Sequence, residues 1–173
     1  MAQLPALSLP EWVALAVIDE TPTHGFAIAG LTAANGPLGA VWQIPRPVVY
    51  RALGRLEEAE LIEATAVEAG NGPQRRIYAA TRRGRAAVDE WLRTPVEHVR
   101  DIRSHLLIKL ALLDRRDRDL ADLLQRQRRQ LEPIVDALGA RPVDTGDGFA
   151  PVLAAWRRAN AEAALSFVAQ LTP

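Results

Sequence analysis

The spacing of apolar residues changes once between residues 45 and 81, from a helical period to an alternating one. At first they recur at steps of three and four, which predicts a helix with a single buried stripe. That stripe consists of Val49, Ala52, Leu53 and Leu56. A period of two then follows, as in a half-buried strand, in which Ile62, Ala64 and Ala66 alternate with Glu63, Thr65 and Glu68. A tip at 70–73, made of glycine, asparagine and proline, precedes a second short run at 75–79, so a β-hairpin is predicted after the helix.

The pattern predicts three more helices in the first half of the chain. Their expected ranges are 8–19, 23–34 and 82–93. Each has a residue at its start whose side-chain oxygen suits an N-cap, namely Ser8, Thr23 and Thr81. A breaker-rich stretch follows the second helix, and residues 41–44 are predicted to form a short strand before the helix that begins near Pro45.

Beyond Thr94 and Pro95 the pattern is almost wholly helical. The expected helices cover about 102–113, 116–138 and 151–171, and a Gly-, Pro- and Asp-rich loop covers 139–150. The last helix repeats apolar residues on one face, which are Val152, Trp156, Ala159, Ala163 and Phe167. We therefore predict two domains, residues 1–94 and residues 95–173.

A helix with arginines on its outer face, followed by a hairpin with arginines beside its tip, is typical of a winged helix–turn–helix. In that arrangement the helix enters the major groove of DNA and the wing contacts flanking phosphates. The expected fold is mainly α with a small β-hairpin wing. Residues 1–94 would bind DNA, and residues 95–173 would form a helical dimerisation domain.

Charge supports this prediction only locally. The whole chain has 21 cationic and 21 acidic side chains, so its bulk charge gives no support for nucleic-acid binding. Within residues 40–86, eight arginines outnumber five glutamates. Lys109 is the only lysine; an arginine fork suits phosphate and guanine, although a GC-rich genome would produce the same bias.

Other chemistries find little support in the sequence. The absence of cysteine excludes disulfides, thiolate zinc sites and cysteine nucleophiles. His98, Asp101 and His105 share helical spacing, but dispersed histidines are common, so no metal site is expected. No serine occupies a nucleophile elbow and no glycine-rich phosphate loop follows a strand, so neither an enzyme nor a cofactor is expected. With no signal peptide or membrane span in the pattern, we expect a cytoplasmic protein that does not enter a membrane.

Several segments together resemble the PadR family of bacterial transcriptional regulators. They are His24-Gly25-Phe26-Ala27-Ile28, Tyr50-Arg51-Ala52-Leu53, Leu56-Glu57, Leu61-Ile62, Asn71-Gly72-Pro73-Gln74-Arg75-Arg76-Ile77-Tyr78 and Thr81-Arg82-Arg83-Gly84. The resemblance is specific over about 9–92 and general over 95–173. It implies a homodimeric winged-helix regulator, most often a repressor, whose C-terminal helices swap around the partner subunit and often border an effector pocket.

Two positions depart from the family pattern. Residues 44–47 supply no Ser or Thr cap for the helix expected to bind DNA, which costs roughly 1 kcal/mol that Pro47 partly offsets. Glu60 replaces the usual glycine before Leu61, and a left-handed backbone there would cost about 1 kcal/mol. These differences concern the ends of the helix rather than its existence.

The predicted DNA-binding residues lie on the outer face of the helix and beside the hairpin tip. They are Arg46, Tyr50, Arg51, Arg55, Asn71, Gly72, Arg75 and Arg76. Tyr50 would either bind a phosphate or cover the edge of the core, and Arg51 and Arg55 would either contact DNA or pair with Glu58. Successive strand residues point to opposite faces, so only one of the two wing arginines faces DNA on a flat hairpin. Trp91 and Trp156 are the candidates for binding an effector, because aromatic anchors also line apolar ligand pockets.

The predicted function is a homodimeric DNA-binding transcriptional regulator, an effector-responsive repressor that binds a two-fold symmetric operator. The expected partners are double-stranded DNA, a second copy of the chain and a small apolar or aromatic effector. Two alternatives remain open. In the first, the helical half recruits another protein and the winged helix serves as a scaffold. In the second, the chain is a helical protein that binds small molecules and has no DNA activity.

Overall fold

The computed structural model describes residues 5–68, 74–140 and 148–172. The chain divides into two compact units, one formed by 1–92 with 107–118 and the other by 93–106 with 119–173. This division differs from the predicted boundary at residue 94, because the segment 107–118 belongs to the first unit. That segment contains Ile108 and Leu112, which are fully buried, and its helix contacts the first helix of the chain.

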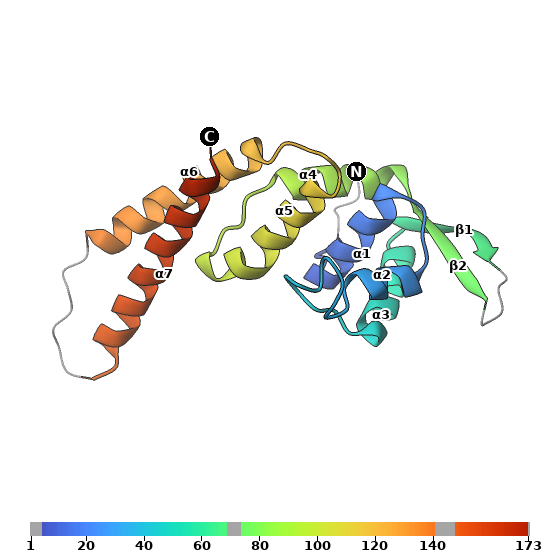
Figure 1. Cartoon of the computed structure of the whole chain (residues 1–173), viewed down its shortest axis with the longest axis horizontal. Helices are drawn as coiled ribbons and strands as arrows, with labels where there is room; N and C mark the ends of the chain where they lie inside the picture. The colour runs from blue at the N-terminus through green and yellow to red at the C-terminus, as the bar shows by residue number, and fades with distance from the viewer. Residues whose placement is uncertain (1–4, 69–73, 141–147, 173) are drawn as a thin grey trace. The chain divides into compact units, whose positions relative to one another are not determined.

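The first unit is a winged helix–turn–helix. Its elements are α1 (Leu9–Glu20), α2 (Gly25–Leu31), α3 (Arg46–Glu58), β1 (Ile62–Glu68), β2 (Arg75–Ala80), α4 (Arg82–Arg93) and α5 (Leu107–Asp114). Helices α1, α2 and α3 pack together, and the antiparallel β1–β2 hairpin extends from them as the wing (Figure 1). The predicted fold class, mainly helical with a small hairpin, is confirmed.

The apolar stripe predicted for α3 forms its buried face. Leu56 is fully buried, and Val49, Ala52 and Leu53 are at most 3% exposed. The helix begins after Pro45, which makes no side-chain capping bond, as expected from the missing Ser or Thr. It ends before Glu60, whose φ of 56° places a non-glycine residue in the left-handed region.

The hairpin and the start of α4 are tied to the helices by local polar contacts. The N–H groups of Thr23 and Tyr78 each donate to the other's carbonyl, at 3.0 and 2.8 Å, which attaches β2 to the segment before α2. Thr81 Oγ1 accepts from Gly84 N–H at 3.1 Å, so Thr81 caps α4 as predicted. The hydroxyl of Thr81 also donates to the carbonyl of Glu60 at 2.9 Å, fixing the turn after α3 to the end of the wing.

Some local predictions for the first unit were wrong. Helix α2 is shorter than predicted, and its N-cap is His24 rather than Thr23, since His24 Nδ1 accepts from Ala27 N–H at 3.0 Å. Residues 41–44 form no strand. Their backbone instead closes turns, with Trp42 N–H donating to the carbonyl of Leu38 at 2.9 Å.

The second unit contains two short irregular helices and a pair of long helices. They are η1 (Val99–Asp101), η2 (Ile102–Leu106), α6 (Ala121–Gly139) and α7 (Ala150–Leu171). The long helices lie side by side (Figure 1). Helix α6 starts later than the predicted residue 116 and continues through Pro133. Its buried Gln127 binds both backbone groups of Val96, accepting from the N–H at 2.7 Å and donating to the carbonyl at 3.0 Å.

Helix α7 has apolar residues on two faces. The face turned toward α6 buries Ala161, Ala164 and Val168. The stripe predicted from the sequence lies on another face, where Val152 is 58% and Trp156 is 66% exposed. Alanines on the first face permit close approach to α6, whereas Val152 and Trp156 on the second face remain largely exposed. No helix in the described ranges is long and apolar enough to cross a membrane.

Candidate nucleic-acid interface

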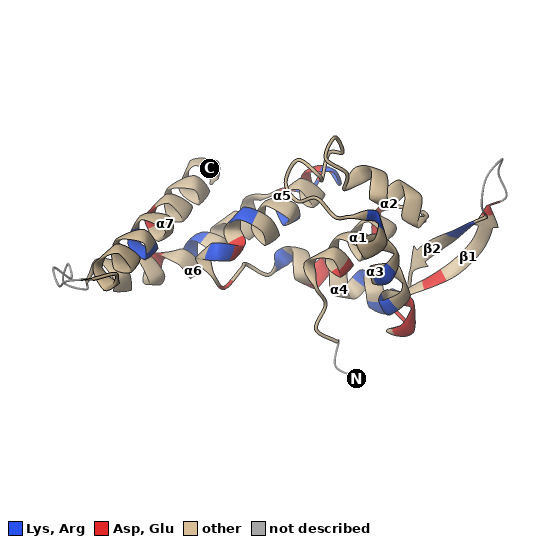
Figure 2. Ribbon diagram, turned by 90° about the horizontal axis from the view of Figure 1, so that it is seen from below, with Lys and Arg blue, Asp and Glu red and all other residues tan. Residues whose placement is uncertain are grey.

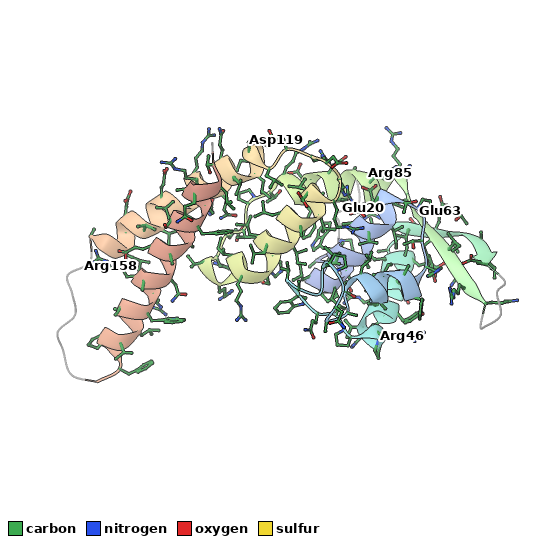
Figure 3. The ribbon with its side chains drawn as sticks, viewed as in Figure 1. Glu20, Arg46, Glu63, Arg85, Asp119 and Arg158 are labelled. Atoms are coloured by element: carbon green, nitrogen blue, oxygen red, sulfur yellow. The ribbon has the colours of Figure 1, made fainter. Side chains whose placement is uncertain are left out.

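The outer face of α3 carries the side chains predicted to contact DNA. Arg46, Tyr50, Arg51 and Gly54 are exposed there, and Figure 3 marks Arg46 at the start of the helix. Tyr50 is 46% exposed, and its ring packs so closely over Gly25 that an added Cβ on that glycine would lie 2.9 Å from Cε1 of the ring. This contact holds the ring against α2, while nearly half of the residue remains exposed.

Arg51 and Gly54 lie on the part of this face where the side-chain positions are open to solvent. Arg51 has neither an ion pair nor a hydrogen bond with the described residues. A Cβ added to Gly54 would meet no atom of the described chain within 4 Å. A tight helix contact inside the described molecule therefore does not explain a glycine at this position, where it costs about 1 kcal/mol relative to alanine.

The start of α3 and the wing meet at a shallow groove of about 350 Å³. It is lined by His24, Gly25, Phe26, Arg46, Tyr50, Gln74, Arg75, Arg76 and Tyr78, with no acidic side chain among them. The guanidinium carbon of Arg46 lies 5.1 Å from the ring centroid of Phe26, and that of Arg75 lies 4.8 Å from the same centroid. The two cations come from different elements and converge on one aromatic ring.

Arg76, the second wing arginine, is engaged inside the molecule. Its two terminal nitrogens donate to both carboxylate oxygens of Glu57, at 2.6 and 3.1 Å. The hydrogen bond to Glu57 raises the pKa of Arg76 above its ordinary value. Because Glu57 lies near the end of α3, this bidentate pair links the wing to the helix. The guanidinium of Arg76 also lies 5.2 Å from the ring centroid of Tyr78, whose pKa is raised mainly by burial.

Arg55 is likewise held inside the molecule. It pairs with Glu11 at 3.0 Å, where the sequence suggested Glu58 as a partner. The side chain of Glu11 is only 3% exposed and also accepts from Ser8 N–H at 2.6 Å. One carboxylate therefore both caps α1 and binds Arg55. Arg55 thus connects α3 to α1.

The predicted residues therefore separate into three groups. Arg46, Tyr50, Arg51 and Arg75 are exposed and share the surface formed by the outer face of α3 and the neighbouring groove. Arg55 and Arg76 are paired with glutamates. Asn71 and Gly72 lie outside the described residues. On the wing, the cationic residues lie on β2 and the acidic residues on β1 (Figure 2).

Sequence reasoning missed Phe26 as a member of this surface. The periodicity places Phe26 in the apolar set of the helix expected over 23–34, but Phe26 is 47% exposed. In the structure α2 begins at Gly25, so Phe26 lies in its first turn. A residue in a first helical turn often lies outside the buried stripe.

The two predicted effector residues lie in different environments. Trp91 belongs to the core of the first unit, where it stacks on Trp12 with the ring centroids 5.1 Å apart. The Nζ atom of Lys109 lies 5.0 Å from the ring centroid of Trp91. Burial lowers the pKa of Lys109 to about 8. Trp156 belongs to the second unit.

Trp156 lines a groove of about 560 Å³ in the second unit. Three arginines and no acidic residue line the same groove, together with apolar side chains of η1 and α6; the arginines are Arg100, Arg103 and Arg157. Arg103 and Arg157 form no ion pair with the described residues. The groove thus combines an apolar lining with unbalanced positive charge.

The metal arrangement considered from the sequence does not assemble. His105 Nδ1 lies 4.0 Å from Asp101 Oδ1, and His98 precedes them as the N-cap of η1. Within the described ranges, no three His, Asp or Glu side chains gather as they would around a metal ion.

Comparison with known proteins gives one match to a family model, and it lies within the first unit. Residues 14–90 match the sequence model of the transcriptional regulator PadR-like family, which confirms the resemblance predicted from the sequence. A comparison with curated proteins gives no match.

Among solved structures, the chain is similar to Bacillus subtilis PadR in complex with operator DNA. The identity is 14%, the TM-score is 0.47, and the match covers 94% of this chain and 97% of that one. It is also similar to smu.1604c from Streptococcus mutans UA159, with 16% identity and a TM-score of 0.44, covering 92% and 96% of the two chains. Bacillus subtilis PadR in complex with p-coumaric acid matches with 14% identity and a TM-score of 0.42, covering 96% of each chain.

Proposed function

Because residues 14–90 match the sequence model of the transcriptional regulator PadR-like family, we propose that this chain regulates transcription by binding double-stranded DNA. The observation that carries the proposal is the exposed surface of Arg46, Tyr50, Arg51 and Arg75, in which a helix and a wing present cations side by side. In this mechanism α3 enters the major groove, and Arg75 on the wing binds a flanking phosphate. The proposed activity is binding, without a catalytic step.

The direct test is a salt-dependent binding titration. The probes are a duplex from the region upstream of the chain's own gene and a random duplex of equal length. We expect tighter binding to the first duplex and a fall in affinity for both between roughly 50 and 200 mM salt. Failure of the whole chain to bind either duplex at the lower salt concentration would overturn the proposal. The favoured alternative would then be a protein-interaction module built on the helical half.

We further propose that the protein is a homodimer and that α7 forms its interface. The exposed stripe containing Val152 and Trp156 has the composition of a helix contact, with alanines flanking a large aromatic anchor. A rigid dimer would place two copies of α3 on half-sites about one helical turn apart, so the operator is expected to be two-fold symmetric.

The dimer proposal predicts which α7 variants change the mass in solution. Trp156→Asp places a charge on the exposed stripe and should convert the dimer to a monomer in sedimentation measurements. Arg158→Gln is the matched control, because Arg158 already pairs with Glu162 on the same helix, at 2.9 Å, and lies off the stripe. A wild-type monomer, or a Trp156→Asp dimer of unchanged affinity, would contradict this interface.

Regulation in this proposal is repression relieved by a small apolar or aromatic effector. The groove beside Trp156 supports such a ligand, and its three arginines favour a negatively charged one. A ligand changes DNA binding only through its different affinity for the two conformations.

The effector proposal is tested with matched probes in calorimetry. 4-Methylbenzoate should bind more tightly than neutral 4-methylbenzamide, and Arg103→Ala should remove the difference. Equal affinity for the two probes would exclude a charge-selective site. For repression, deletion of the gene should raise expression from its own promoter, and a fall in expression would instead indicate an activator.

A further inference from the structure

Phe26 is an exposed aromatic residue whose ring contacts cations rather than the core. Nearly half of it, 47%, is accessible. The guanidinium carbons of Arg46 and Arg75 lie 5.1 and 4.8 Å from its ring centroid. One cation belongs to the first turn of α3 and the other to the first residue of β2. The ring therefore forms a contact shared by the helix and the wing.

Stacking on a ring orders a guanidinium without using its hydrogen-bond donors. Those donors lie in the plane of the group, so a stacked arginine can still bind a phosphate through its edge. Arg46 receives a second contact of the same kind from Tyr50, whose ring centroid is 5.8 Å away. Two ordered cations that converge on one ring repel each other, and an anion placed beside both would relieve that repulsion.

The neighbouring acids do not neutralise this pair. Glu57 is bound by Arg76, and Glu68 lies 3.8 Å from His24 Nε2. Within the described ranges, neither Arg46 nor Arg75 forms an ion pair with a carboxylate. The groove that both line likewise contains no acidic residue. The two arginines are therefore available to an external anion.

We propose that Phe26 is a positioning residue that holds Arg46 and Arg75 together as a single site for a DNA backbone phosphate. The site joins the start of α3 to the wing, so that both elements bind the duplex as one rigid surface. Without the ring, each arginine would have to be ordered separately when DNA binds. This inference rests on the proposed DNA-binding function.

The test uses the whole protein and a random 30-base-pair duplex, because a phosphate contact does not depend on sequence. Phe26→Leu removes the aromatic face and keeps an apolar side chain, whereas Phe26→Tyr keeps the ring. Loss of two exposed cation–π contacts predicts an affinity about five- to thirty-fold lower for Phe26→Leu. Phe26→Tyr should stay within about two-fold of wild type. Phe26→Tyr should keep the midpoint of thermal unfolding, and Phe26→Leu should remain folded with a midpoint lower by at most a few degrees, because the two contacts that it loses are made in the free protein.

Salt dependence and a double-mutant cycle distinguish positioning from direct contact. Arg75→Gln should lower the salt slope by about 0.9, because it removes a phosphate-binding charge, while Phe26→Leu should leave the slope unchanged. In an Arg46→Gln and Arg75→Gln background, Phe26→Leu should have little further effect. Arg129→Gln, in the second unit, controls for the loss of one positive charge.

Two results would overturn the inference while leaving the proposed function intact. The first is that wild type binds the duplex and Phe26→Leu binds it equally well. The second is that Phe26→Leu weakens binding as much without the two arginines as with them. If wild type itself fails to bind any duplex, the proposed function fails and this site fails with it.

Discussion

Gly54→Ala tests whether another molecule comes close to the outer face of α3. Gly54 lies inside the helix, and a Cβ added there would meet no described atom within 4 Å. The folded protein should therefore accept the methyl group without strain. Alanine is favoured over glycine in a helix interior by about 1 kcal/mol, so this variant should be more stable than wild type. For a chain of this length, that gain corresponds to a rise of roughly 2–4 °C in the unfolding midpoint.

DNA binding should change in the opposite direction. If the sugar-phosphate backbone approaches Gly54 closely, the added methyl group forces the two surfaces apart. Overpacking of a close contact costs about 1–3 kcal/mol, so the affinity should fall roughly 5- to 150-fold. Thermal unfolding and fluorescence anisotropy on the same samples measure the two effects.

Gly139→Ala is a suitable control for this pair of measurements. Gly139 ends α6 in the second unit, and a Cβ there also meets nothing within 4 Å among the described atoms. It should leave DNA affinity unchanged. If Gly54→Ala were more stable and bound DNA as tightly as wild type, no close approach would occur at this face. If it were less stable, the conformation of α3 described above would be wrong.

Four further substitutions test other parts of the first unit. Arg51→Gln should lower the salt slope of DNA binding by about 0.9 without changing stability. Arg55→Gln should lower the free energy of unfolding, measured in urea, by about 1 kcal/mol, because it removes the partner of the buried carboxylate of Glu11. The exposure of the guanidinium keeps this loss small. A loss of stability in Arg51→Gln together with a lower salt slope in Arg55→Gln would contradict these roles. Gly84→Ala should destabilise the protein by roughly 1–3 kcal/mol in the same assay, because the added Cβ would collide with the carbonyl oxygen of Leu61. If the variant were as stable as wild type, that close packing would be refuted. Burial lowers the pKa of Lys109 to about 8, so between pH 8 and 10.5 the unfolded chain binds more protons and stability should rise with pH. Lys109→Met should be more stable than wild type at pH 7 by about 1–3 kcal/mol and lose that advantage toward pH 10.5; a constant difference would show that the amine does not titrate as described.

Local sequence determined the elements that carry the proposed site. The stripe from Val49 to Leu56 specifies a helix, and the alternation after it specifies a strand, because each pattern depends only on the geometry of a few neighbouring residues. The strand forms over 62–68, but the expected half-burial was wrong, since only Ile62 is buried. The turn at Glu60 and the cap at Thr81 were predictable for the same reason. The family resemblance rests on these same local segments and was confirmed over residues 14–90.

Tertiary structure decided which arginines are available for DNA. Arg76 and Glu57 are 19 residues apart in sequence, and Glu11, the partner of Arg55, lies on a different helix. Spacing along one helix could suggest only a neighbour such as Glu58. The ring of Phe26 likewise became part of the surface only through contacts with α3 and β2.

The allocation of helix faces shows the same division. The sequence identified an apolar stripe on α7 but not which face packs against α6, since that helix is apolar on two sides. It also placed residues 107–118 with the second half, although their buried side chains complete the first unit. Periodicity is a property of consecutive residues and can be seen in the sequence. Which element a helix face packs against depends instead on which surfaces, distant in sequence, fit together.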